Sequence, residues 1–462
     1  MVKKIGSVLS LCAMLVVQAQ DISTIRNTTE VYSNNASNGS SKYQGMAGSM
    51  GALGGDYSVL HSNPAGLGVS VANDVSVTLG INNYKSKTTF SGQTADYKTT
   101  QTDLANAGGI ISFRTPESSK WKFVNIGINY SYQPLDNYIE SPADNSYQYI
   151  SNTDVTLAYN GHAYNRYGNA SKMSIGVGTN YDNKFYLGAG LHLHSAVLDQ
   201  YDTASYTLPS GSVDFYNKQS TPFSETADGF SANVGVIGKV NNNFRLGLAV
   251  ETPTWWRISR GYNYYDDPYY GDGNAVEDRN LRTPLKTTFS AAYVAGKSFS
   301  INVDYALGLT KPHYKEYGAA EEELNDFFSS EAKNFSEFKI GAEYRLAQFR
   351  LRGGYALAMS PFDNFNVTTV NNGNASYDNF ILGQRNTLAL GLGYDFKSFY
   401  IDAAYQNVSS KFANPYLQGD AAYSSGYYAT LPNENIIENG GYFVSDSKLT
   451  RNNVTVTVGW KF

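Results

Sequence analysis

The alternation of apolar and polar side chains constrains the fold of this chain more than any other feature. In residues 454–462, every second side chain is Val, Trp or Phe, and the residues between them are Thr, Gly or Lys. A period of two with one wholly apolar face predicts a β-strand that lies half in an apolar medium. This strand ends in Phe462, and a terminal aromatic residue of this kind is typical of barrels inserted by the outer-membrane assembly machinery, which we expect as a partner.

The same pattern recurs along the chain and predicts an all-β fold of fourteen strands. Tight links alternate with long loops, and an even strand number with this layout is typical of an outer-membrane β-barrel. Strands of about ten residues are long enough to cross the hydrocarbon at a tilt. Because an open sheet edge would leave backbone groups unpaired in lipid, the antiparallel sheet must close. The predicted strands are residues 74–84, 106–113, 121–133, 171–181, 184–198, 229–240, 243–251, 285–296, 298–310, 335–346, 348–359, 385–396, 398–409 and 452–462.

Composition agrees with a barrel and excludes other classes. The chain holds 38 Tyr, 23 Phe and 43 Gly, with only 16% charged residues, as expected of a barrel with aromatic girdles. A formal net charge of -5 gives no concentrated positive charge for nucleic acid. No apolar run after the leader reaches the 18 residues of a transmembrane helix. The single cysteine, Cys12, excludes a disulfide framework.

The first residues have the pattern of a signal peptide. Lys3 and Lys4 precede an apolar run over residues 5–17, and Ala19 supplies the small residue of a cleavage site. We therefore expect residues 1–19 to be removed during export, and residues 74–462 to form the transmembrane barrel.

A glycine-rich stretch over residues 43–67 precedes the barrel. Gly45, Gly48, Gly51 and Gly54 recur at every third position. Glycine disfavours a long helix and permits close approach of one backbone to another. The stretch ends in an Asn-Pro turn signal. We predict that residues 20–73 lie on the periplasmic side of the barrel, and that the glycine-rich piece folds back into the lumen as a hatch.

The chain carries the motifs Gly45-Met46-Ala47-Gly48, Asn63-Pro64-Ala65-Gly66-Leu67, Leu281-Arg282-Thr283-Pro284 and Arg352-Gly353-Gly354-Tyr355. With these motifs it resembles the FadL/TodX family of outer-membrane transporters of long-chain fatty acids and other hydrophobic compounds. The resemblance implies a fourteen-stranded barrel with an N-terminal hatch, in the outer membrane of a Gram-negative bacterium. It implies passive uptake, with capture at the extracellular loops, a lumenal site gated by the hatch, and sideways release at a kink in the third strand. No feature of residues 121–133 predicts such a kink.

Three sets of residues are candidates for the site. Asn63, Pro64, Ala65 and Gly66 align with the hatch motif of the family. Trp255 and Trp256 lie in a predicted long loop, where they would form an apolar capture patch. Basic residues on the polar faces of strands would pair with a ligand carboxylate, or with neighbouring carboxylates as a solvated charge network. These are Arg245, Lys339, Arg345, Arg350 and Arg352.

Three functions remain open from the sequence. The first is passive transport of hydrophobic compounds by a monomer surrounded by outer-membrane lipid. The second is a haemin receptor, because His192 and His194 share one strand face and histidine is a haem ligand. The third is a non-transporting scaffold barrel, as in a type IX-like secretion system. The sequence holds no HExxH, GxSxG or paired-cysteine signature, so we expect neither an enzyme, a metal site nor a cofactor.

Overall fold

The structure is a computed structural model, and it describes residues 22–33, 38–150, 156–218, 220–267, 271–369, 372–416 and 442–462. The predicted signal peptide lies outside these ranges.

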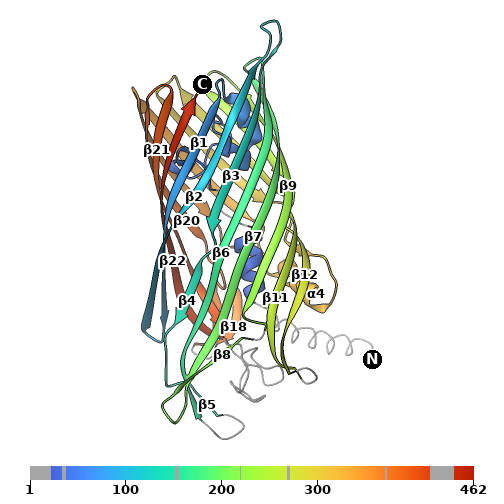
Figure 1. Ribbon diagram of the computed structural model, residues 1–462, viewed down its shortest axis with the longest axis vertical. Helices are drawn as coiled ribbons and strands as arrows, with labels where there is room; N and C mark the ends of the chain where they lie inside the picture. The colour runs from blue at the N-terminus through green and yellow to red at the C-terminus, as the bar shows by residue number, and fades with distance from the viewer. Residues whose placement is uncertain are drawn as a thin grey trace.

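The predicted barrel of 14 antiparallel strands is confirmed. Strand β1 (Asp74–Phe90) pairs with β2 (Gln93–Arg114) on one side and with β22 (Phe443–Lys461) on the other, so the wall is closed (Figure 1). Between β2 and β22 the wall runs through β3 (Trp121–Pro134), β6 (Thr156–Tyr181), β7 (Phe185–Thr207), β9 (Phe223–Lys239), β10 (Phe244–Glu251), β13 (Lys286–Ala295), β14 (Phe299–Gly308), β16 (Ser336–Leu346), β17 (Phe349–Ala358), β20 (Arg385–Asp395) and β21 (Phe399–Tyr416).

The two ends of the barrel differ as the alternation of turn lengths predicts. At the short-turn end, links are tight, and Asp182 and Asn183 adopt left-handed φ values of 53° and 52° to join β6 to β7. The long-loop end carries the smaller elements. These are β4 (Asn137–Ser141), β5 (Gln148–Ile150), β8 (Val213–Asn217), β11 (Trp255–Asp267), β12 (Gly271–Arg282), β15 (His313–Tyr314), α4 (Ala319–Ser330), β18 (Phe365–Thr369) and β19 (Gly373–Tyr377). No helix in the described ranges is long and apolar enough to cross a membrane.

The outward face of the wall is a continuous apolar belt. Leu246 is 57% exposed, Leu390 58% and Trp460 50%, although each lies in the middle or at the end of a paired strand. Such exposure of large apolar side chains is what a barrel presents to lipid. On β1, the belt covers Val75 to Ile81 and gives way to Lys85 and Lys87.

Several strands are longer than the alternation predicts. Strand β6 begins at Thr156, where residue 171 was expected, and β11 and β12 form a hairpin in a predicted loop. The interpretation of these segments as loops was wrong. Beyond the belt both strand faces carry polar residues, so pairing continues there without the apolar period that reveals a strand.

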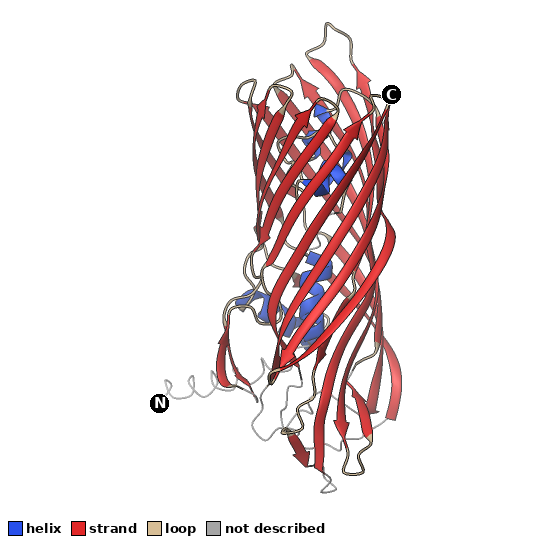
Figure 2. Ribbon diagram, turned by 90° about the vertical axis from the view of Figure 1, so that its left-hand side faces the viewer, coloured by secondary structure: helices blue, strands red, loops and turns tan. Residues whose placement is uncertain are grey.

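The N-terminal residues fill the lumen as two separate pieces (Figure 2). The hatch proper contains α3 (Ser41–Gly45), η3 (Tyr57–His61) and η4 (Pro64–Val69), and it lies toward the short-turn end. A second piece, which we call the N-terminal segment, contains α2 (Ile22–Asn27) and η2 (Thr28–Ser33). The N-terminal segment does not lie on the predicted periplasmic side. It lies toward the long-loop end, because its buried polar side chains find partners there, such as Asn414 for Arg26.

Candidate functional site

The hatch packs against the wall at the positions where glycine allows it. A Cβ atom on Gly45 would lie 3.0 Å from the Cα of Gly391 in β20. Asn63 caps the turn of the hatch motif, since its Oδ1 accepts from Ala65 N at 3.1 Å and its Nδ2 donates to Gly51 O at 2.8 Å. The glycine-rich stretch therefore packs closely against the wall, and Asn63 joins its two halves.

A single methyl group on the wall should loosen this packing. In Gly188→Ala, the added Cβ would lie 2.3 Å from the carbonyl carbon of Pro64, so the hatch must shift. Overpacking of this kind costs typically 1–3 kcal/mol. We expect Gly188→Ala to lower the thermal unfolding midpoint. Gly353→Ala is the matched control, because no atom lies within 4 Å of its added Cβ. Equal midpoints for the two variants would contradict close packing of the hatch motif on β7.

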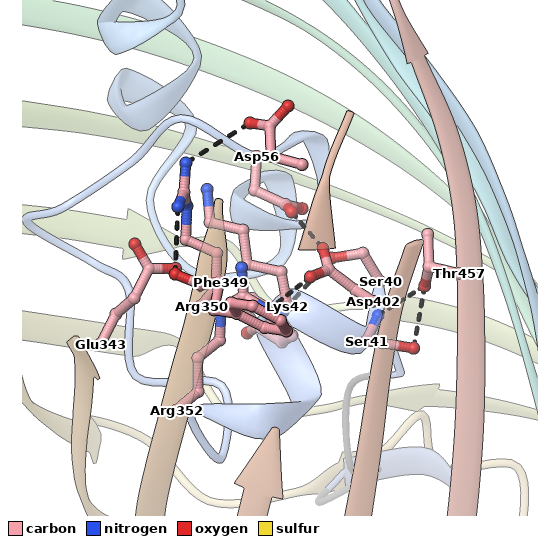
Figure 3. Close-up of polar contacts among 12 residues, drawn as sticks. Ser40, Ser41, Lys42, Asp56, Glu343, Phe349, Arg350, Arg352, Asp402 and Thr457 are labelled. Carbon is pink, nitrogen blue, oxygen red and sulfur yellow. Dashed lines mark hydrogen bonds and ion pairs between the residues drawn. The ribbon is translucent and has the colours of Figure 1, made fainter. Parts of the chain in front are cut away.

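Polar contacts join the start of the hatch to the last strand of the wall (Figure 3). Ser41 N donates to Thr457 Oγ1 at 2.7 Å, and Ser41 Oγ donates to Thr455 Oγ1 at 3.0 Å. Within the hatch, Ser40 Oγ donates to Asp56 Oδ2 at 2.7 Å. The two bonds of Ser41 hold the hatch against β22, so movement of this part of the hatch requires that they break.

Arg352 is held by two carboxylates beside the hatch (Figure 3). Its Nε donates to Glu343 Oε2 and its Nη1 to Asp402 Oδ1, both at 2.7 Å, and all three side chains are buried. The other oxygen of Glu343 accepts from Arg345 Nε at 2.6 Å. Arg352 and Arg345 thus belong to the charge network that the sequence offered as the alternative to ligand binding.

The remaining basic candidates also have partners. Arg245 Nη1 donates to Leu53 O of the hatch at 3.1 Å, and Arg350 lies 3.5 Å from Asp395. Lys339 Nζ lies 2.9 Å from Glu337 Oε2. Among the five candidates, Lys339 alone lines a cavity inside the barrel. The strand pattern placed all five inward, but it does not say which of them reaches free space.

This cavity has a volume of about 250 Å³ and lies between the hatch, the N-terminal segment and the wall. Tyr43 and His61 line it from the hatch, and Glu30 lines it from the N-terminal segment. Its charges are balanced, with five cations against five anions. They are Arg166, Lys286, Lys339, Arg385 and Arg451 against Glu30, Asp136, Glu251, Asp304 and Glu337.

The cavity extends to the place where β2 and β3 stop pairing, which we call the break in the wall. Pairing of these strands ends at Asn106 with Ser131, whereas β2 continues back to Gln93. Beyond Pro134 the chain leaves β2 and continues as β4, which still pairs with β6. The residues around the break line the cavity. They are Asn82, Asn83, Tyr84, Thr99, Gln101, Gln133, Pro134, Leu135 and Asp136.

Side chains of β22 and β1 hold the bend at Leu135–Asp136. Arg451 of β22 donates to Pro134 O at 3.0 Å and to Asp136 O at 2.7 Å. The hydroxyl of Tyr84 on β1 accepts from Tyr138 N at 3.0 Å. The bend therefore turns toward the lumen, where these groups lie. Sequence reasoning missed Arg451 and Tyr84, because nothing local marks them as partners of the third strand.

Arg166 links the bend to the N-terminal segment. Its Nε donates to Leu135 O at 3.0 Å, its Nη1 to Asn27 Oδ1 at 2.7 Å and its Nη2 to Glu30 Oε2 at 3.0 Å. The buried guanidinium of Arg166 thus contacts both the bend of the third strand and the N-terminal segment. Displacement of the N-terminal segment would remove two of the three partners that orient Arg166.

The histidines lie between the hatch and the wall. The rings of His61 and His192 are 6.4 Å apart, and those of His192 and His194 are 6.2 Å apart. His192 is 0% exposed, and its Nδ1 lies 2.8 Å from Ser174 Oγ. No group of three His, Cys, Asp or Glu side chains in the described ranges is arranged to hold a metal ion. His192 thus has no exposed ring edge at which a haem iron would bind.

His61 should make docking of the hatch sensitive to acid. Its Nε2 accepts from Asn129 Nδ2 at 2.6 Å, since Asn129 Oδ1 already accepts from Asn106. Burial holds the pKa of His61 well below its usual value, and the positive charge of Lys172 acts in the same direction. A depressed histidine pKa means that the undocked state binds more protons, so docking stability is lost as pH falls below about 6.5.

We therefore expect planar-bilayer conductance to rise between pH 7.5 and pH 5 in the wild type. His61→Gln should show a smaller rise, because glutamine accepts the same hydrogen bond from Asn129 and does not titrate. His192 and His194 face the same cluster, so an unchanged acid response in His61→Gln would assign the effect to them instead.

The two tryptophans lie in strand β11 and point to opposite sides of the wall. Trp255 is 49% exposed and stacks on Phe230, with ring centroids 6.5 Å apart. Trp256 is 5% exposed, faces the lumen and donates from Nε1 to Tyr32 O at 3.3 Å. The structure does not bring them together as one patch. Strand alternation separates them.

Solved structures share the fold of this chain. A FadL homologue of Pseudomonas aeruginosa aligns with a TM-score of 0.59 and 13% identity, over 93% of this chain and 99% of that one. The toluene transporter TodX of P. putida aligns with a TM-score of 0.54 and 13% identity over the same shares. The toluene transporter TbuX of Ralstonia pickettii gives 0.54 and 14%, again over 93% and 99%. No family model and no curated protein sequence matches the chain.

At this level of identity the comparison establishes the fold. The resemblance to FadL and TodX that the sequence motifs suggested is confirmed in the architecture of the barrel. Two of these three structures are described as toluene transporters, and the third is described as a FadL homologue.

Proposed function

We propose that the protein is a passive outer-membrane channel for hydrophobic compounds. The observation that carries this proposal is the cavity that joins a plugged lumen to a break in the wall. A hydrophobic molecule gains little from an aqueous pore, whereas a sideways path delivers it into lipid. The break lies beside Asn82 and Asn83, where the apolar belt of β1 ends.

The substrate class that we favour is the long-chain fatty acid. Lys339, Lys286 and Arg385 line the cavity, so the carboxylate of a bound fatty acid would find cationic side chains in the cavity wall. Lys339 and Arg385 both contact Glu337, at 2.9 Å and 3.4 Å. A ligand carboxylate would compete with Glu337 for these two groups.

Passage requires the plug to move. The hatch occupies the short-turn side, and the N-terminal segment lies against the bent third strand through Arg166. We propose that ligand enters from the long-loop end, that the hatch and the N-terminal segment gate the cavity, and that release occurs through the break between β2 and β3. Neither the haemin receptor nor the scaffold barrel is favoured by a contact in the described ranges.

A bulky side chain at the break tests the route. Thr99 lines the cavity, and its neighbour Thr100 is exposed on the other face of β2. In a strain deleted for the gene, wild type should restore uptake of labelled oleate. Thr99→Trp should restore little, because the indole fills the break, and Thr100→Trp should restore it fully. Equal uptake with the two variants would contradict lateral release, and absence of uptake with wild type would contradict the transport of fatty acids.

A further inference from the structure

Five lysines form a patch on the outer surface of the wall, across four neighbouring strands. In β1 and β2, Lys85 lies directly opposite Lys98. One row further, Lys87 of β1 lies opposite Lys448 of β22, and Lys448 lies opposite Lys411 of β21. Cross-strand partners share a face, and all five side chains are exposed. We call these five residues the lysine patch.

The lysine patch has fewer neighbouring carboxylates than it would need to neutralise its five positive charges. Like charges directly opposite each other destabilise a sheet. Asp96 lies opposite Lys87, and Asp446 lies one row beyond the patch, which leaves an excess of cations. No ion pair is found for any of the five lysines within the described ranges. This concentration of positive charge stands out in a chain whose net charge is -5.

The position of the lysine patch relative to the apolar belt identifies its partner. Lys85 follows Ile81, the last belt residue of β1, by four positions, or about 13 Å along a strand. The patch lies toward the long-loop end, so it faces the headgroups of the leaflet on that side. A partner that covers both surfaces must carry acyl chains next to anionic groups.

We propose that the lysine patch binds the phosphate groups of an anionic lipid in the outer leaflet, whose acyl chains lie on the apolar belt of β1 and β22. This inference uses the membrane placement of the proposed function and does not depend on transport. Lysine suits this role because its ammonium group pairs with phosphate as a point charge. Each lysine near an anionic lipid surface contributes enough to raise affinity roughly fivefold.

Native mass spectrometry of the purified protein in nonionic detergent tests the proposal. The probes are lipid A, a glycolipid with two phosphates, and the same glycolipid after removal of both phosphates. We expect wild type to retain the phosphorylated form selectively. The variant K87Q/K411Q/K448Q should bind it on the order of 100-fold more weakly, and K87R/K411R/K448R should retain it.

The matched control neutralises three exposed lysines at the other end of the barrel, in K120Q/K297Q/K397Q. This control should bind lipid A as wild type does. Equal retention of the two glycolipids by wild type would overturn the proposal, and so would equal losses in the patch variant and the control variant. A protein that binds lipid A but transports no oleate would leave this inference intact and contradict the proposed function alone.

Discussion

The double variant S41C/T455C is expected to lose transport when oxidised and to regain it when reduced. The side-chain oxygens of Ser41 and Thr455 are 3.0 Å apart, so the sulfur atoms of two cysteines there would lie within reach of each other. The bond would tie the hatch to β22. If the hatch gates the cavity, oleate uptake into proteoliposomes should fall to the level of empty vesicles. The only natural cysteine, Cys12, lies in the predicted signal peptide.

The control for this variant places a disulfide within the wall. Thr89 and Thr94 lie opposite each other on β1 and β2, with oxygens 3.2 Å apart. T89C/T94C should transport equally well in both redox states, because neither residue belongs to the hatch or bonds to it. Full transport by oxidised S41C/T455C would show that ligand passes without movement of this part of the hatch.

Arg352→Met is expected to be the most destabilising single change at the boundary between hatch and wall. It leaves Glu343 and Asp402 buried without their shared cation, and breaking a buried pair in this way typically costs about 3–5 kcal/mol. The thermal unfolding midpoint should fall sharply. Conductance should also become noisier, since Gly45 of the hatch lies beside the side chain of Arg352.

The triple variant R352M/E343Q/D402N separates charge from packing. It also neutralises the two carboxylates that Arg352 pairs with, so it should recover most of the lost stability, because replacing a whole buried ionic group is often close to neutral. If the triple variant is as unstable as Arg352→Met, the loss of stability comes from the lost packing of the arginine side chain and not from the broken ionic network.

The sequence predicts the barrel well because a strand in lipid has one apolar face. The alternation ending at Trp460 and Phe462 is visible without any knowledge of the partner strand. The same rule fails at Thr156 and Gly271, where strands continue past the belt and polar residues occupy both faces. Register and pairing persist there through backbone hydrogen bonds, which leave no mark on side-chain polarity.

The bend of the third strand could not be predicted because its causes are remote in the chain. Pro134 ends β3, but the groups that hold the bend come from β1, β6 and β22, as Tyr84, Arg166 and Arg451. The roles of the lumenal cations were equally hidden. Alternation places Arg352 and Lys339 on inward faces alike, and only the position of the hatch decides that Arg352 is covered while Lys339 lines the cavity.

Facilitated transfer of a fatty acid is the most direct test of the account. Proteoliposomes containing the wild-type protein should take up fluorescent oleate saturably and without an energy source, faster than empty vesicles. Thr99→Trp should remove the acceleration, and Thr100→Trp should preserve it. If wild-type proteoliposomes take up oleate no faster than empty vesicles, the account of a passive channel with a lateral exit is contradicted.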